Sequence, residues 1–400
     1  MPVPVQPLTL AAAEQRIEPC NREVRAAALA VEAARGDLRV AAQRPNPALS
    51  LTVNNMSPHN GLGSGSLRDK AIDQEVRLEQ LIERGGKAGL RTAQGEANVR
   101  AAQADLAEQK RQQRLAVRVA FFELAAVQER LALQREFRGF AQESAAASRR
   151  RLESGDIARA EANRFRLDAV RVENDVRQAE TDLYRARLEL ARLLGAESMA
   201  SSLEVVADWA LAPGAAASGE RPDVAAARLR VEAAENAREL ARQLGTRDVT
   251  VGLEADRSPV TEINPTATGI TYGVSVSIPL FVRHRNEGEL ARALADLEIA
   301  RATLERVREQ AQAEARVAEQ EWSAARERRE RLESEVRPIA HEVASAAEYA
   351  YSRGATGVLD LLDARRSLKG VELDELQARL EAARSWARRE AALEVTQPQP

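Results

Sequence analysis

Two stretches of this chain alternate apolar and polar residues with a period of two. The clearer stretch covers 247–280 and is interrupted by a loop rich in Pro, Asn and Thr. Its apolar positions are Val249, Val251, Leu253 and Ala255 before the loop, and Ile270, Tyr272, Val274, Val276, Ile278 and Leu280 after it. Two segments of about ten residues, each with one apolar and one polar face, are typical of membrane-spanning β-strands. We predict strands at about 248–257 and 269–281.

The same pattern occurs two hundred residues earlier. Strands are predicted at about 48–57 and 71–82, separated by the flexible sequence PHNGLGSGS. The motif Val-Glu-Ala-Ala also occurs twice, at 31–34 and 231–234, with the same offset as the strands. The sequence therefore predicts an internal duplication in which helix, β-hairpin and long helices are written twice.

Between the predicted strands, Ala, Glu, Arg and Leu follow a helical pattern with few prolines. The first repeat is assigned to 1–195, with a long helical hairpin at 88–194, and a linker to 196–220. The second repeat is assigned to 221–393, with a helical hairpin at 289–393, followed by a tail at 394–400. Gly155 and Gly354 are expected to turn the two hairpins, and Pro338 to kink the longer second-repeat helix.

Composition supports long packed helices over compact globular cores. Aromatic residues make up 3% of the 400 residues and charged residues 30%. A net charge of −3 gives no reason to expect a nucleic-acid partner, and a single cysteine excludes a disulfide framework. No apolar run is long enough for a transmembrane helix, and MPVPVQPLTL lacks the features of a signal peptide. If the protein is exported, we expect this sequence to be a mature, truncated or mis-started chain.

The sequence offers no catalytic chemistry. It contains no phosphate-binding loop, no nucleophile elbow and no pair of metal ligands at helical spacing. His59, His284 and His341 fall in different predicted elements. We therefore expect neither an enzyme nor a cofactor or metal site.

Four amphipathic strands are too few to close a barrel, and an open sheet would leave two edges and an apolar face exposed. Three copies would supply twelve strands, an allowed number for a barrel with a polar lumen. Long Ala-rich helices can pack side by side into a wall in the same symmetry. The expected assembly is a homotrimer, in which a 12-stranded transmembrane β-barrel continues into an α-barrel.

The residues at the predicted turns carry a resemblance to a known family. The second-repeat turn, YAYSRGATGVLDLLDARRSL at 349–368, and the first-repeat turn, LESGDIARAEANR at 152–164, resemble those of the outer-membrane efflux (TolC-like) proteins. The segments RPNP at 44–47 and VSVSIPL at 274–280 extend the resemblance over essentially the whole chain. The sequences around 85–87 and 277–288 are most similar to the metal-cation branch, the CzcC-like and CusC-like ducts.

The resemblance implies an outer-membrane location in a Gram-negative bacterium, extension into the periplasm, and an exit-duct function. It further implies a periplasmic adaptor protein, a proton-driven inner-membrane pump of the resistance–nodulation–division (RND) class, and contact with outer-membrane lipid. Cobalt, zinc or cadmium, or monovalent copper or silver, would be the cargo.

The resemblance also implies roles at the hairpin tips. Asp360 and Asp363 match an acidic pair that lines the channel gate, where rings of carboxylates would attract cations. Glu161 matches an acidic position that bonds a tyrosine of the neighbouring turn, here Tyr351, to hold the tip closed. Thr356 stands where the family has a basic residue. The remaining tip residues, expected to form the turns or contact the adaptor, are Gly155, Gly354, Arg151 and Arg353.

Simpler interpretations and other functions stay open at this stage. Asp360 and Asp363 could merely stabilise a helix N-terminus, and the basic run at 149–151 could be a solvated surface. A duct for organic solutes or for type I protein secretion differs from the metal duct only in its partners. A soluble coiled-coil interaction protein would explain the helices, but not two β-hairpins of membrane-spanning length.

Overall fold

The computed structural model describes residues 7–56, 72–212, 214, 219–258 and 269–395. The chain forms two compact units. The first, here called the helical unit, comprises Met1–Ala30, Gln103–Ala225 and Arg306–Pro400. The second, the sheet unit, comprises Val31–Ala102 and Ala226–Glu305. The mainly α fold with a small antiparallel sheet, predicted from the sequence, is confirmed.

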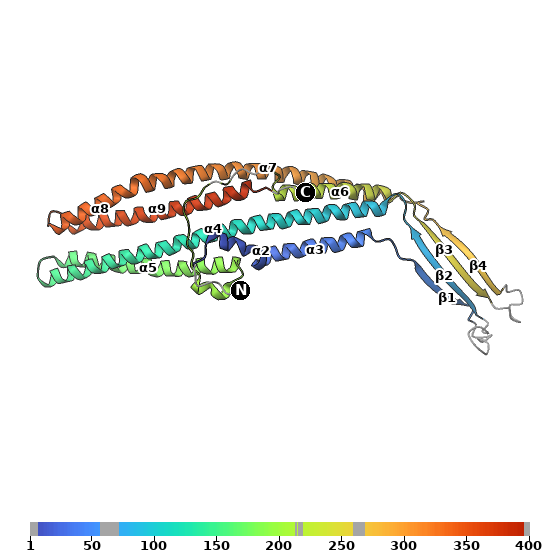
Figure 1. Ribbon diagram of the computed structural model, residues 1–400, viewed down its shortest axis with the longest axis horizontal. Helices are drawn as coiled ribbons and strands as arrows, with labels where there is room; N and C mark the ends of the chain where they lie inside the picture. Colours follow the sequence, from blue (N-terminus) through green and yellow to red (C-terminus); the bar gives the residue numbers. More distant parts are fainter. Residues whose placement is uncertain (1–6, 57–71, 213, 215–218, 259–268, 396–400) are drawn as a thin grey trace. The chain divides into compact units, whose positions relative to one another are not determined.

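The sheet unit contains one four-stranded antiparallel sheet in the order β1-β2-β3-β4 (Figure 1). The strands are β1(Ala48–Asn54), β2(Asp73–Ile82), β3(Val249–Ser258) and β4(Gly269–Ser277). The hairpins of the two repeats join through β2 and β3, with Arg77 opposite Glu254 and Leu78 opposite Leu253. β4 ends before Pro279, which has no N–H to donate to a ladder, so the strand expected to reach residue 281 stops at Ser277. Residues 57 and 71, at the ends of two predicted strands, lie outside the described residues.

One face of this sheet is apolar and exposed. The register places apolar side chains opposite one another across all four strands, as in the pairs Leu51–Val76 and Leu253–Val274. Leu51 is 71% exposed, Val274 72% and Tyr272 83%. A large exposed apolar patch is typical of a surface that binds a membrane or another protein.

Ion pairs tie the sheet to the helices that follow it within the sheet unit. The buried ammonium of Lys87 lies 2.8 Å from Asp248 Oδ2, and it also donates a hydrogen bond to the carbonyl of Thr246. Arg91 is bidentate to Glu83 at the end of β2. Because Lys87 begins α4 and Asp248 precedes β3, this contact joins the two repeats at the base of the sheet.

The helices are long, and several run from one unit into the other. From the N-terminus they are α1(Leu10–Gln15), α2(Ile17–Cys20), α3(Arg22–Ala42), α4(Lys87–Glu153), α5(Arg159–Leu193), the short 3₁₀ turn η1(Glu197–Ser202), α6(Pro222–Gln243), α7(Glu287–Arg331), η2(Leu332–Val336), α8(Arg337–Ser352) and α9(Val358–Leu393). Thr9 caps α1 by accepting a hydrogen bond from the Ala12 N–H, as the residue type at this position predicts. None of the helices in the described part of the chain combines the length and apolarity that a bilayer crossing requires.

The core of the helical unit gathers around two adjacent phenylalanines of α4. Phe121 and Phe122 are 0% and 1% exposed, and their rings meet edge to face with centroids 5.5 Å apart. Trp209 of the linker packs against Phe122 at 5.5 Å, and Trp386 of α9 packs against it at 6.1 Å. The linker after the first repeat is therefore part of the core.

Where the sequence predicts a kink at Pro338, the structure has a π-helical segment, η2, just before the proline. The N–H of Arg337 bonds to the carbonyl of Leu332, five residues back. Because Pro338 has no N–H, a regular α-helix would lose a hydrogen bond here. The wider π turn accommodates the proline, and α8 continues as a helix.

Candidate functional site

The two tip turns of the helical unit have the same backbone geometry. After α4, the Asp156 N–H bonds to the carbonyl of Arg151, and Gly155 has φ +83°. After α8, the Ala355 N–H bonds to the carbonyl of Ala350, and Gly354 has φ +71°. This six-residue closure with a left-handed glycine is the Schellman motif. Both glycines occupy a conformation that other residues rarely adopt, which is the physical reason for the turns predicted there.

The tip of the first repeat meets that of the second at Tyr351. Arg151 Nη1 donates a hydrogen bond of 3.0 Å to the Tyr351 hydroxyl, and its guanidinium carbon lies 5.8 Å from the centre of the tyrosine ring. The ring also packs on Phe165 of α5, with centroids 6.4 Å apart. Phe165 in turn forms a small buried cluster with Val358 and Leu362 of α9. Arg151 therefore has a contact within the chain that the sequence did not predict.

The acidic pair lies on the exposed face of the first turns of α9. Asp360 Oδ2 accepts a hydrogen bond of 3.3 Å from the Gly357 N–H, so this carboxylate caps the helix. The Asp363 side chain is 76% exposed, and Arg366 lies 3.8 Å away. The buried residues Leu361 and Leu362 hold this face outward. The structure thus gives Asp360 a structural role, whereas Asp363 caps nothing.

The other predicted tip residues are nearby in the fold. Glu161 is half-buried in the first turn of α5, and Arg353 stacks on the ring of Tyr349 at 5.3 Å. Within this chain the described partner of the Tyr351 hydroxyl is Arg151. The hydroxyl of Thr356 is buried and lacks a hydrogen-bond partner among the described residues.

A cavity of about 390 Å³ lies behind the tips, between α4, α5, α8 and α9. Ion pairs cross it: Lys369 lies 2.6 Å from Asp175, and Arg366 lies 3.0 Å from Asp168. His341 Nε2 lies 3.2 Å from Glu372 Oε1. Burial raises the pKa of Glu372 above its ordinary value, and the nearby Glu136 carboxylate adds to this, although His341 opposes it. These contacts hold the two helical hairpins together.

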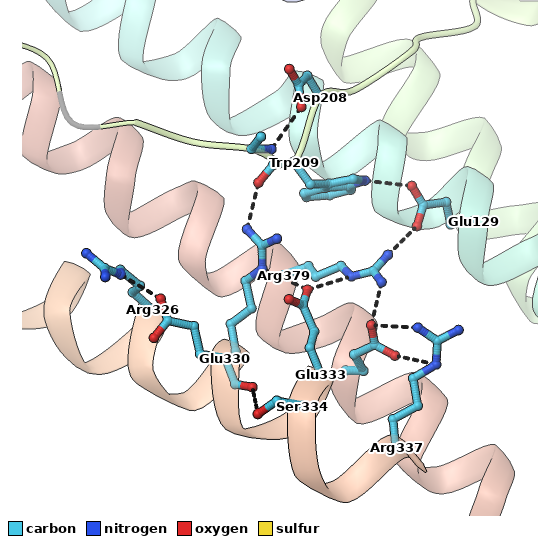
Figure 2. Close-up of polar contacts among 12 residues, drawn as sticks. Glu129, Asp208, Trp209, Arg326, Glu330, Glu333, Ser334, Arg337 and Arg379 are labelled. Atoms are coloured by element: carbon cyan, nitrogen blue, oxygen red, sulfur yellow. Dashed lines mark hydrogen bonds and ion pairs between the residues drawn. The ribbon is translucent and has the colours of Figure 1, made fainter. Parts of the chain in front are cut away.

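A second polar network, which sequence reasoning missed, surrounds the π-helical segment. Figure 2 shows Arg379 of α9 at its centre, bonded to Glu333 of η2 at 3.2 Å and lying 3.6 Å from Glu129 of α4. Arg379 also pairs with Glu375, which is 4% exposed and lies 3.3 Å from Arg337 of α8.

The linker takes part in this network. The indole N–H of Trp209 donates to Glu129, and the Trp209 carbonyl accepts from Arg329 of α7 (Figure 2). The sequence signals for this network were two spacings of four, Glu375 with Arg379 and Arg329 with Glu333. The network joins α4 and the linker to α7, η2, α8 and α9.

The start of the second repeat is held by a buried arginine. Arg221 is 7% exposed and pairs with Asp223 at 2.6 Å and with Glu314 of α7 at 2.7 Å. Burial tends to raise the pKa of Asp223, but the Arg221 guanidinium outweighs this and leaves it lower than usual. Burial also tends to raise the pKa of Glu314, but hydrogen bonds from Gln310 and Arg221 outweigh it and leave this pKa lower than usual.

Among the described residues, no group of three or more His, Cys, Asp or Glu side chains is arranged to hold a metal ion. The features that remain are the exposed apolar face of the sheet, its polar face and the two tip turns.

A comparison with protein families decides the assignment. The model of the family described as "Outer membrane efflux protein" matches residues 15–196 and 215–393. The chain belongs to the outer membrane efflux protein family. It is an outer-membrane protein of Gram-negative bacteria that extends into the periplasm, and its relatives are channels, not enzymes.

Individual relatives agree with this family. The chain is 28% identical to the cobalt-zinc-cadmium resistance protein CzcC of Cupriavidus metallidurans over 369 residues, covering 90% of this chain and 84% of that protein. Its fold is similar to that of CusC, with a TM-score of 0.81 and 17% identity over 97% of this chain and 92% of the other. The CmeC outer membrane channel of Campylobacter jejuni gives a TM-score of 0.83 and 14% identity, over 96% and 85% of the two chains.

Proposed function

We propose that three copies of this efflux protein form the exit duct of a tripartite pump that exports heavy-metal cations across the outer membrane. The observation that carries the duct is the four-stranded sheet, which has one exposed apolar face and two strands, β1 and β4, at its edges. Three such sheets joined edge to edge would pair these edges and turn the apolar faces to lipid.

The metal cargo rests on a different observation. The relative with 28% identity is named for cobalt, zinc and cadmium resistance, and the similarity covers most of both chains. By analogy, the partners would be a periplasmic adaptor protein and a proton-driven RND pump in the inner membrane. The duct itself would need no tight metal site, since cargo must leave as readily as it enters.

The tips would form the periplasmic entrance. Asp360 and Asp363 would line the gate as rings of carboxylates, with Asp363 the more accessible of the two. Glu161 would engage the Tyr351 of a neighbouring turn, and the exposed turns at Gly155 and Gly354, with Arg151 and Arg353, would meet the adaptor. The duplicated turn geometry supports this because the two turns present similar backbone surfaces to the adaptor.

Two measurements test the proposal. The mass of the detergent-extracted protein should correspond to a trimer that forms ion-conducting channels in planar bilayers; a detergent-independent, non-conducting monomer would contradict it. Expression in a strain lacking its own metal exit duct, with the cognate pump and adaptor, should lower cellular cobalt and zinc. Lower accumulation of an organic dye with unchanged metal would assign the duct to organic solutes instead.

A further inference from the structure

The polar face of the sheet carries an unusual arrangement of charge. In the described residues of the four strands this face has five carboxylates, and Arg77 is its only basic residue. The carboxylates belong to Asp73, Glu75 and Glu79 of β2 and to Glu254 and Asp256 of β3. In the proposed duct this face would line the lumen.

Arg77 is bonded to three of these carboxylates at once. Its Nη2 lies 2.6 Å from Glu75 Oε1 and 2.9 Å from Glu254 Oε2, and its Nη1 lies 3.7 Å from Glu79 Oε1. Glu254 stands directly opposite Arg77 in the β2–β3 register, whereas Glu75 and Glu79 flank it on its own strand. The guanidinium therefore occupies the centre of a three-carboxylate cluster.

The neighbouring strand is shaped to allow this cluster. Glu254 lies across Gly273 of β4, so closely that a Cβ on that residue would come within 2.6 Å of Glu254 Oε1. Gly252 of β3 makes room for another neighbour, because a Cβ there would clash with Ser275 Oγ. The glycine at 273 therefore lets the long side chain of Glu254 lie flat on the sheet.

With Arg77 between them, these three carboxylates are not arranged to hold a metal ion. Without Arg77 they would be unpaired carboxylate oxygens close together, which are the ligands that divalent cations prefer. A duct that exports divalent metals would be slowed by such a site in its wall, because cations would bind there instead of passing. We infer that Arg77 is a built-in counter-ion that fills this cluster, so that the lumen stays acidic enough to attract metal cations but does not retain them. The inference rests on the proposed duct and concerns its specificity.

The test is zinc block of potassium current through channels in planar bilayers, with zinc chloride as the probe. Wild-type channels should conduct with little block at millimolar zinc. Arg77→Gln should free the three carboxylates, raise the preference for potassium over chloride, and lower the half-blocking zinc concentration by about tenfold. The double variant Arg77→Gln/Glu254→Gln removes one of the freed carboxylates and should return the half-blocking concentration toward that of the wild type.

Arg257→Gln is the matched control, because it removes one positive charge at a β3 position on the opposite face of the sheet. It should leave the zinc response unchanged. Should Arg77→Gln fail to assemble, Arg77→Lys provides the same test: one ammonium cannot bridge both strands as the planar guanidinium does, so zinc block should increase by a smaller factor.

An unchanged half-blocking concentration in the assembled Arg77 variant would overturn the inference, as would an equal shift in Arg257→Gln. A wild-type protein that forms no channels would instead defeat the proposed duct. Failure of the inference alone would leave wild-type conductance and trimer mass as proposed.

Discussion

Arg151, at the end of α4, donates a hydrogen bond of 3.0 Å to the hydroxyl of Tyr351, at the end of α8. The two residues lie 200 positions apart in the sequence, at the tips of the two repeats. Their contact is exposed, so its contribution to stability is small. The contact matters instead for how the two tips are positioned relative to each other.

Removing this hydrogen bond should loosen the contact between the two tips. Tyr351→Phe keeps the ring packed on Phe165 but removes the acceptor, and Arg151→Gln removes the donor. We expect each variant to raise the opening frequency in single-channel recordings. Because both remove one contact, the double variant should open no more often than either single variant.

Arg150→Gln is the matched control for this series. It removes an exposed positive charge from the adjacent position, away from the contact with Tyr351. Its opening frequency should equal that of the wild type. Additive effects of Arg151→Gln and Tyr351→Phe would show that the hydrogen bond is not what holds the tip.

The acidic pair of α9 allows gating to be separated from helix capping. Asp363→Asn should change the free energy of unfolding by less than about 0.5 kcal/mol, because the side chain is exposed and caps nothing. Asp360→Asn weakens the bond to the Gly357 N–H and should cost about 0.5–1 kcal/mol. Both should lower the cation preference measured from reversal potentials. If selectivity falls only in Asp360→Asn, the pair acts through helix stability.

The Arg379 network should matter more to stability than its exposed neighbours. Arg379→Met leaves the buried Glu375 with Arg337 alone, and it also removes the contacts with Glu333 and Glu129. We expect a loss of about 2–3 kcal/mol in unfolding free energy, measured by denaturant titration in detergent. Arg326→Gln, which breaks an exposed pair with Glu330, should leave the free energy of unfolding nearly unchanged. Equal losses in the two variants would argue against a special role for the network.

The Arg221 cluster predicts a pH-dependent contribution to stability. Arg221 lowers the pKa values of Asp223 and Glu314, so both carboxyls are more acidic in the folded than in the unfolded chain. Their stabilising effect is complete at pH values above the pKa in the unfolded chain, which is about 4. The effect is lost as the pH falls through the lower pKa values of the folded chain. Arg221→Met should therefore cost about 1–3 kcal/mol at pH 7 and much less at pH 3, by unfolding in detergent. A loss that does not change between the two pH values would assign the effect to packing.

The sequence predicted those features that depend on local pattern. The period of two located all four strands. Gly155 and Gly354 located the tip turns, because the left-handed backbone of such a turn favours glycine. A kink was expected at Pro338, but the π-helical segment before it was not, because its form depends on how η2 packs. The long-range partners of Arg151, Arg221 and Arg379 could not be predicted. They are Tyr351, Glu314, and Glu333 with Glu129, and each lies far away in a sequence where many arginines and glutamates could satisfy the same pattern.

The π turn between α7 and α8 fixes the rotational phase of the segment that leads to the second tip. A π turn contains one residue more than a turn of regular helix. This extra residue rotates everything beyond it by about 100° around the helix axis. Ala340 and Ala344 are buried in α8 with this offset in place. Deleting one residue from 332–336 would restore regular helical hydrogen bonding, yet rotate these small side chains out of their buried positions. Sequence exchanges between related ducts should therefore keep the number of residues in this segment unchanged.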